Sequence, residues 1–377
     1  MSAISKYKEE SIQEACKRIS SNYGCLVLGI DYILNLGRNN KLLWWNFVSS
    51  FTDNPNINID FDGSLFIEYH PFRDDDITFK ASLKKEEIAL LSDSNAKSFI
   101  EQRKNSGKNT AIFVGNGVSI PFGSCQWEVL SDNLFDFLSP YYVDDLDKVA
   151  TAIGDTTYAK TSIVNMNISP AKYINSLWSS IYDKYETKMH VPNTLIRSIV
   201  KIKNKYSNTL LYTYNYDEFL ELDYEEAFHR TLAHCIDEKS HLSTYEPMVT
   251  HLHGIVSYKS KMKRHTVLTS EEYYENYKTS KWVYRTQYDA LYNNLSLFVG
   301  SSLSDLFQMS VINDVRTNKY KKYSPLEGLW FCYALLCFKD MSTKDIAIVY
   351  NYYYRKGVKI IFTDDYVKLP ALLDSLF

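Results

Sequence analysis

The chain has 377 residues but few cysteines, and they are scattered along it. No C-x-x-C pair occurs, so the sequence lacks the ligands of a cysteine-based zinc module. The closest two, Cys332 and Cys337, share an apolar segment with no second pair to match, which argues against a secreted disulfide framework. We expect these thiols to act as small buried apolar groups: Cys16, Cys25, Cys125, Cys235, Cys332 and Cys337.

Long apolar runs and an excess of charge are also missing. The longest apolar run, residues 329–338, is too short to span a bilayer. Residues 1–18 form a charged amphipathic pattern without the apolar core of a signal peptide. We therefore expect a cytoplasmic protein with no membrane partner. A formal net charge of -3 gives no general attraction to nucleic acid, so direct nucleic-acid binding is not expected.

Strands alternate with helices along residues 110–377, which predicts an α/β fold with a doubly wound, Rossmann-like parallel sheet. Helices are expected over residues 127–138, 270–294 and 343–355, and a helical insertion over about 140–205. The strands are expected over residues 110–114, 209–214, 248–254, 295–299, 330–338 and 358–363.

Residues 1–106 are predicted to form an accessory α+β region, and residues 107–377 the catalytic domain. Helix patterns cover residues 2–20 and 83–103. Between them, apolar and polar residues alternate on both sides of an Asp62–Gly63 turn, which predicts a β-hairpin. The alternating residues are Ile57, Ile59, Phe61, Leu65, Ile67 and Tyr69.

Small and polar residues follow the first strand of the predicted catalytic domain. They are Gly115, Asn116, Gly117, Ser119 and Pro121. Glycines at such a loop allow the backbone to approach a diphosphate, and N–H groups at the next helix start can hold its charge. A tight turn with no ligand explains the same glycine pair, because the full dinucleotide fingerprint is absent.

Polar side chains follow the next two strands as well. Thr213, Asn215 and Asp217 come at the end of one, and His253 comes just before Gly254 at the end of the other. The carboxyl ends of parallel strands are where ligands bind in such sheets. Asn215 and Asp217 could instead cap the following helix, and His253 could be a satisfied structural side chain or a base.

A fourth strand end carries small hydroxyl residues and a carboxylate. The strand over residues 295–299 is followed by Gly300, Ser301 and Ser302, and Asp305 stands at the next helix start. The serine hydroxyls could bind ribose or phosphate oxygens.

In this order the four strand ends resemble the sirtuin superfamily, over roughly residues 108–377. Thr213, Asn215 and Asp217 fall in register with its T-x-N-Y-D segment. Gly300, Ser302 and Asp305 match its G-x-S-x-x-D segment, and His253 corresponds to its catalytic histidine. Asn116 departs from the Ala or Ser that usually separates the two loop glycines. The chain especially resembles zinc-free sirtuin-like NAD⁺ hydrolases that act in bacterial antiphage defence.

The resemblance implies NAD⁺ as substrate and no zinc. Breaking the nicotinamide–ribose bond passes through an oxocarbenium-like state and needs an oriented ribose and a base. Asn215 would orient the ribose and the attacking water, His253 would act as general base, and Asp217 would orient the Asn215 loop or the substrate. The loops at residues 115–121 and 300–305, together with Thr213, would hold the ribose and diphosphate.

The expected activity is therefore that of a regulated NAD⁺ glycohydrolase which depletes NAD⁺ during phage infection. The resemblance implies control through a homo-oligomer, a HerA-type ATPase or a nucleotide-processing subunit. One alternative is a module that senses NAD⁺ or ADP-ribose without turnover. A deacylase or ADP-ribosyltransferase is disfavoured by the missing zinc ligands. A dehydrogenase is disfavoured because no acidic residue follows a second strand at the usual offset.

Overall fold

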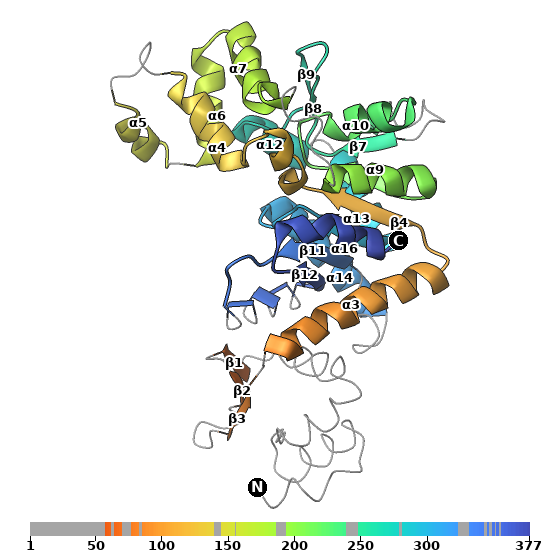
Figure 1. Cartoon of the computed structure of the whole chain (residues 1–377). Helices are drawn as coiled ribbons and strands as arrows, with labels where there is room; N and C mark the ends of the chain where they lie inside the picture. Colours follow the sequence, from red (N-terminus) through yellow and green to blue (C-terminus); the bar gives the residue numbers. More distant parts are fainter. Residues whose placement is uncertain are drawn as a thin grey trace, which may run out of the picture. The chain divides into compact units, whose positions relative to one another are not determined.

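The computed structural model describes residues 57–61, 64–69, 77–82, 85–138, 145–154, 156–185, 194–238, 248–278, 281–322, 332–342, 345–346, 349–350, 352–353 and 356–377. The chain divides into two compact units (Figure 1). The first comprises residues 1–101, 316–331 and 338–364, and the second residues 102–315, 332–337 and 365–377. The helix expected over residues 2–20 lies outside the described residues, and the one expected over 343–355 lies partly outside them.

The first unit contains a three-stranded antiparallel sheet of β1 (Ile57–Phe61), β2 (Ser64–Tyr69) and β3 (Ile77–Ser82). Phe61 pairs with Leu65, as the predicted hairpin requires, so that prediction is confirmed. The third strand was not predicted, although its apolar residues also alternate with polar ones. Helix α3 (Lys85–Asn105) follows.

Two buried polar side chains join α3 to β12 (Val358–Thr363) within the first unit. The Ser92 hydroxyl donates to the Phe362 carbonyl at 3.0 Å and accepts from the Phe362 N–H at 2.8 Å. Asn95 Nδ2 donates to the Ile360 carbonyl at 2.9 Å. The two side chains bind backbone groups of β12 in the way that a neighbouring strand would. Such bonds are needed because backbone polar groups inside a fold require partners.

The large sheet has seven strands in the order β12-β11-β10-β4-β5-β7-β6. Its pairs from β11 to β6 are parallel, which confirms the predicted α/β class. The strands of the second unit are β4 (Thr110–Val114), β5 (Leu210–Thr213), β6 (Ala233–Cys235), β7 (Met248–His251), β10 (Leu295–Val299) and β11 (Cys332–Cys337). A small antiparallel pair, β8 (Ile255–Val256) and β9 (Lys263–Arg264), lies outside this sheet.

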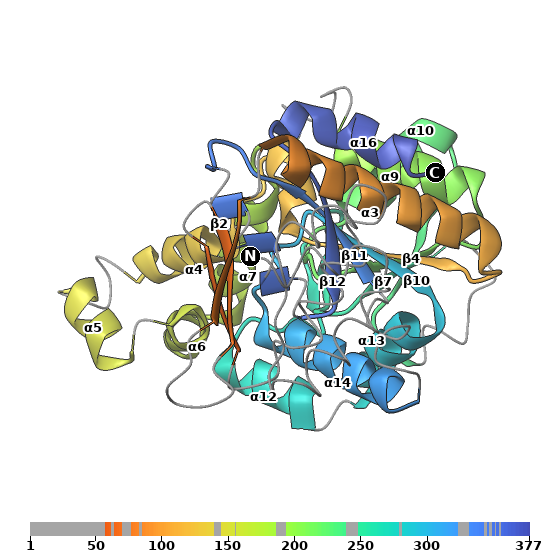
Figure 2. The same ribbon diagram turned by 90° about the horizontal axis from the view of Figure 1, so that it is seen from below.

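Helices lie on both faces of the large sheet, as in a doubly wound fold. Figure 2 shows α9 (Leu195–Lys205), α10 (Phe219–Phe228) and α16 (Leu369–Ser375) on one side and α13 (Lys281–Asn293) on the other. Helix α9 packs against α10 and α16 through a buried apolar stripe. Helix α14 (Leu306–Lys322) follows β10, and the short η4 (Tyr366–Lys368) precedes α16.

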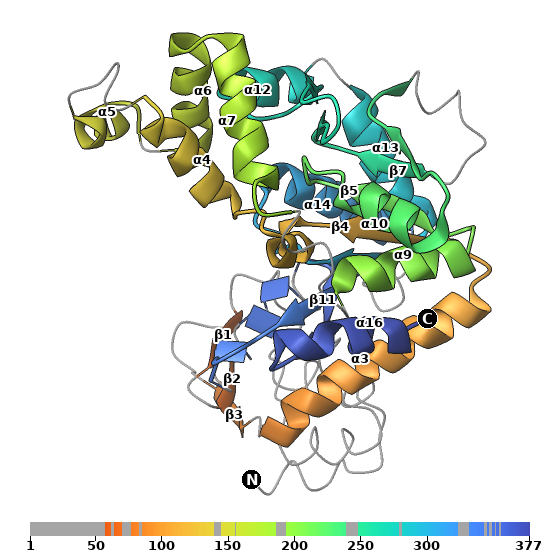
Figure 3. The same cartoon turned by 45° about the horizontal axis from the view of Figure 1, so that its top comes forward.

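A cluster of helices follows the loop after β4. Helices α4 (Trp127–Asp136), α6 (Thr157–Asn167) and α7 (Pro170–Tyr182) pack together, and α12 (Ser270–Lys278) packs on α6 (Figure 3). Helix α5 (Leu146–Ala152) precedes α6. The single helix predicted over residues 270–294 is wrong: the structure has two helices, α12 and α13.

The centre of the large sheet is held by a stack of three aromatic rings. Phe113 on β4 stacks on Tyr212 of β5 at 4.9 Å and on Phe298 of β10 at 4.8 Å between ring centroids. The three residues share one register across the strands. Because offset aromatic stacks add to burial, they fix the strands whose ends carry the candidate site. No helix of the described residues is long and apolar enough to cross a bilayer.

Candidate active site

The structure brings the four predicted strand ends to one edge of the sheet. Strands β10, β4, β5 and β7 are neighbours in that order, and each adjacent pair is parallel. Their carboxyl ends therefore open on the same side, where ligands bind in open α/β sheets. All of the predicted site residues belong to the second unit.

The loop after β4 is packed directly against the loop after β10. The Gly115 N–H donates to the Val299 carbonyl at 2.9 Å, and the Gly117 N–H donates to the Gly300 carbonyl at 2.8 Å. A Cβ at Gly115 would lie 2.6 Å from the Gly300 oxygen, and one at Gly117 would lie 2.8 Å from it. The glycines thus allow two loops to approach each other, and the Gly117 N–H already has a partner.

The rest of this loop forms two short 3₁₀ turns, η2 (Asn116–Val118) and η3 (Ile120–Phe122). The Asn116 amide donates to the Cys125 carbonyl and accepts from the Ser124 hydroxyl at 3.2 Å. Asn116 therefore closes the loop on itself. Pro121 lies in the first turn of η3 and is exposed.

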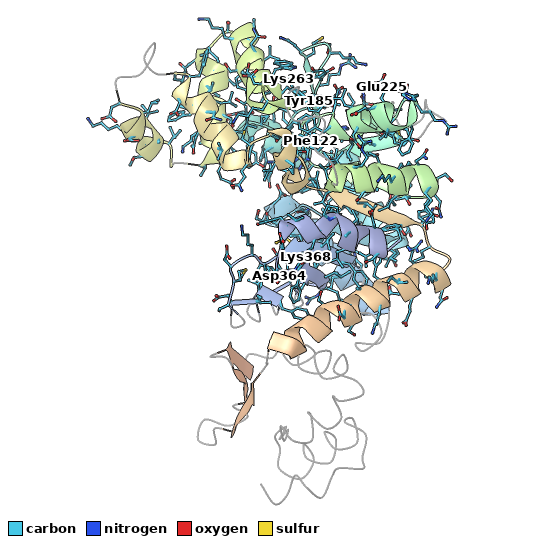
Figure 4. All side chains as sticks on the ribbon, viewed as in Figure 1. Phe122, Tyr185, Glu225, Lys263, Asp364 and Lys368 are labelled. Atoms are coloured by element: carbon cyan, nitrogen blue, oxygen red, sulfur yellow. The ribbon has the colours of Figure 1, made fainter. Side chains whose placement is uncertain are left out.

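An aromatic cluster anchors the end of the same loop. Phe122 lies 5.5 Å from Phe219 of α10 and 6.2 Å from Tyr185 between ring centroids (Figure 4). Tyr185 stacks on Phe219 at 4.9 Å. All three rings are buried, so the loop after β4 and the start of α10 are held together by apolar packing.

Asn215 is the residue most completely fixed at this edge. Its Nδ2 donates to the Gly115 carbonyl at 3.2 Å and to the Ser119 hydroxyl at 2.9 Å, and its N–H donates to Thr213 Oγ1 at 3.0 Å. Because a carbonyl only accepts, the amide nitrogen must face Gly115. Asn215 Oδ1 is buried and has no hydrogen-bond partner among the residues that the structure describes. A buried unpaired amide oxygen is costly, so it offers an acceptor to a bound hydroxyl or water.

Asp217 stabilises the turn into α10 and shares a partner with Asn215. It accepts from the Phe219 N–H at 3.2 Å and from the Ser119 side chain. Burial raises the pKa of Asp217 to about 6, although the bonds from Ser119 and Phe219 oppose the shift. Ser119 is completely buried and thus links the two side chains that follow β5.

His253 stands in the turn after β7, with its ring edge-to-face on Tyr214 at 5.2 Å between centroids. It is 8% exposed. Burial lowers the pKa of His253 and the Asp305 carboxylate opposes this shift, so the ring is neutral at pH 7 and can accept a proton. Gly254 next to it has φ +79, and a Cβ there would lie 2.2 Å from the His265 carbonyl oxygen.

The loop after β10 is held by side-chain bonds into α14. Ser301 Oγ donates to Gln308 Oε1 at 3.3 Å, and Asp305 Oδ1 accepts from the Gln308 N–H at 2.8 Å as a helix cap. Ser302 is exposed, and its hydroxyl lies 2.7 Å from that of Ser304. Of the two serines that were predicted as site residues in this loop, Ser302 is therefore the more exposed, and the Ser301 hydroxyl binds Gln308.

Sequence reasoning missed several buried polar residues behind the site. Tyr214 Oη donates to Gln287 Oε1 at 3.0 Å, and Gln287 and Gln308 are almost completely buried. His251 and Glu221 form a pair at 2.6 Å beside the Asn215 main chain. The signal available for His251 was the His-x-His spacing with His253; nothing in the sequence marked the glutamines. Among the described residues, no group of three or more His, Cys, Asp or Glu side chains could hold a metal ion.

The fold is an α/β fold with a Rossmann-like parallel sheet, and a family comparison adds to this class. Residues 209–346 match the family model of the SIR2-like domain. The matched range contains Asn215, Asp217, His253 and the loop after β10, and the loop after β4 precedes it. No curated protein matches the chain. A SIR2-like domain implies NAD binding and NAD-related activity.

Gly254→Ala should destabilise the chain, because both the backbone angle and the neighbouring carbonyl oppose a side chain there. We expect the free energy of unfolding to fall by about 2 kcal/mol or more, measured by urea denaturation. Gly107→Ala is the matched control, since Gly107 also has positive φ (+65) but nothing lies within 4 Å of its Cβ position. Equal losses in the two variants would contradict the assigned clash.

Asp217→Asn should remove a pH dependence of stability. The folded pKa of about 6 lies above the ordinary 3.8, so the folded chain binds more protons between these values and loses this stabilisation as pH rises. Asn keeps the acceptor for Ser119 and Phe219. The stability of the variant relative to the natural chain should therefore rise by roughly 3 kcal/mol at most between pH 4 and 7.

Urea denaturation at each pH measures this difference. Asp374→Asn, at an exposed position of α16, is the matched control. A constant difference for Asp217→Asn across the pH range would contradict the raised pKa.

Proposed function

We propose that this chain hydrolyses NAD⁺ at the nicotinamide–ribose bond and releases nicotinamide and ADP-ribose. The observation that carries the proposal is the buried Asn215 amide. Its nitrogen is bound to Gly115 and Ser119, and its oxygen has no hydrogen-bond partner in the described part of the chain. It lies at the same sheet edge as a neutral histidine, His253. The SIR2-like match supports NAD⁺ as the ligand.

Asn215 would orient the reacting groups. Cleavage develops positive charge on the ribose, and a water or hydroxyl must be held at the correct face. Both amide protons of Asn215 are used by Gly115 and Ser119, so the direction of Oδ1 is fixed before substrate binds. A fixed acceptor avoids the entropy cost of orienting the amide during the reaction.

His253 would act as the general base. Its ring is neutral at pH 7, so it can take a proton from the attacking water or a ribose hydroxyl. The Asp305 carboxylate favours the charged ring, which stabilises the imidazolium that forms. The edge-to-face contact with Tyr214 holds the ring plane.

The two loops would hold the rest of the substrate. The exposed Ser302 hydroxyl, which lies 2.7 Å from that of Ser304, is suited to the ribose or diphosphate because of its position on the surface of the loop. Ser119, Thr213 and Ser301 are less exposed and support the loops through their hydrogen bonds. Gly115, Gly117 and Gly300 keep the two loops close enough to act on one ligand.

We further propose that the activity depletes NAD⁺ in bacterial antiphage defence and is held inactive until infection. The resemblance of the four strand ends to defence effectors supports this role. Control is expected because unregulated NAD⁺ hydrolysis would harm the host. A homo-oligomer, a HerA-type ATPase or a nucleotide-processing subunit would supply the control. Helices α5 to α7 offer one surface for it, with Met166 of α6 67% exposed.

His253→Ala should lower the rate of nicotinamide release by about 10²- to 10⁴-fold, the usual contribution of a positioned base. Because the pKa of His253 is lowered, the rate of the natural chain should stay constant above pH 6.5 and fall only on further acidification. Nicotinamide is measured by liquid chromatography. His229→Asn, at an exposed histidine with positive φ that ends α10, is the control. Normal release by His253→Ala would remove this residue from the mechanism.

Asn215→Ala should abolish most release while NAD⁺ binding persists, because the change removes the orienting oxygen and leaves the loops. We expect about a 10²-fold lower rate, with Kd for NAD⁺ measured by calorimetry. Asn208→Ala, at an exposed position before β5, is the control.

Release should be measured with and without lysate from phage-infected cells. A requirement for lysate would support regulation. NAD⁺ binding with no release under either condition would refute the hydrolase and favour an NAD⁺ sensor.

A further inference from the structure

A buried ion pair lies directly behind Asn215. His251 Nε2 lies 2.6 Å from Glu221 Oε1, and His251 Nδ1 lies 3.3 Å from the Asn215 carbonyl oxygen. His251 is completely buried, and only about a tenth of the Glu221 side chain is exposed. The pair therefore contacts the main chain of the residue that carries the proposed function, and no solvent separates them.

The position of His251 is set by the sheet. His251 is the last residue of β7 and pairs in register with Thr213, the last residue of β5. The next N–H, that of Leu252, donates to the Thr213 carbonyl at 2.8 Å. The ring is thus fixed to the backbone from which the Asn215 turn begins.

The two contacts of His251 require an extra proton. The Asn215 carbonyl can only accept, and so can an ionised Glu221 carboxylate. Both bonds form only if the ring carries two N–H groups, or if Glu221 is protonated and donates to Nε2. In either state Nδ1 carries a hydrogen that it donates to Asn215.

The charges around the ring favour that proton. Four titratable side chains interact electrostatically or through ring contacts within this group: Asp217 and Glu218 from the β5–α10 turn, Glu221 from α10 and His234 from β6. Burial opposes a charge on the ring, but the carboxylates of Glu221 and Asp217 outweigh it and raise the pKa of His251. His251 and His253, two residues apart, are therefore shifted in opposite directions.

We propose that His251 is a positioning residue: with Glu221 it holds a shared extra proton and donates Nδ1–H to the Asn215 carbonyl, which keeps the Asn215 amide on Gly115 and Ser119. This role rests on the proposed function, because it acts through Asn215. The two histidines of the His-x-His segment then have different roles: His251 is a protonated support, and His253 is a neutral base.

Two substitutions separate the two contacts of His251. The amide nitrogen of Asn lies as many bonds from the main chain as Nδ1, and that of Gln as many as Nε2. His251→Asn can therefore keep the bond to Asn215 and lose Glu221, whereas His251→Gln keeps Glu221 and loses Asn215. We expect His251→Gln to lower kcat for NAD⁺ cleavage by about 10- to 100-fold with KM little changed, and His251→Asn to stay within a few fold of the natural chain.

Protonation of Nδ1 can be measured without any turnover. In ¹⁵N-histidine NMR spectra of the natural chain at pH 7, the signal that disappears in His251→Gln should show a protonated Nδ1. An unprotonated Nδ1 at this signal would overturn the proposal, and His251→Asn, which lacks the same signal, assigns it a second time. Equal kcat for His251→Gln and the natural chain would refute the positioning role alone. Absence of release from the natural chain would refute the proposed function and the positioning role together.

Discussion

The close approach of two loops, after β4 and after β10, is the constraint on which the site depends. Gly115 and Gly117 pack on the Gly300 backbone at distances that leave no room for a Cβ. This contact places the Gly115 carbonyl where it can accept a hydrogen bond from Asn215. It also places the Ser119 hydroxyl within hydrogen-bond distance of Asn215. A side chain at either glycine would separate the loops, and the Asn215 amide would lose the partners that set its direction.

Around that contact the chain buries an unusual set of titratable groups. Asp217, His251 and His253 lie at or just after the ends of the neighbouring strands β5 and β7, and burial alone disfavours the charged form of each. The structure offsets this by pairing Glu221 with His251 and by giving Asp217 the Ser119 hydroxyl. Among the described residues no carboxylate lies at hydrogen-bond distance from His253, and burial lowers its pKa, so it stays neutral. Groups whose pKa values are moved apart in this way are typical of acid–base sites.

The fold was predictable because its signals are local. Period-two alternation around Asp62–Gly63 gave the β1–β2 hairpin, and buried strands followed by glycine or polar residues gave the parallel sheet. The pattern over residues 270–294 was predicted as one helix from its Glu-rich start, whereas the structure has the two helices α12 and α13. Strand β3 was not predicted, because its alternation of apolar and polar residues is short and directly follows a polar loop.

The sequence by itself determined which residues reach the edge of the sheet: Asn215, Asp217 and His253 follow neighbouring parallel strands, and that requires only strand order and direction. Tertiary structure decided what each does there. Asn215 binds Gly115, a hundred positions away, and Glu221 on helix α10 contacts His251 on strand β7, thirty positions away. Such partners are chosen by packing between elements, whereas periodicity and spacing describe only one element at a time. For that reason only the fold shows that the glycines are contacts between two loops, that Asn116 closes its loop, and that His251 is a buried support.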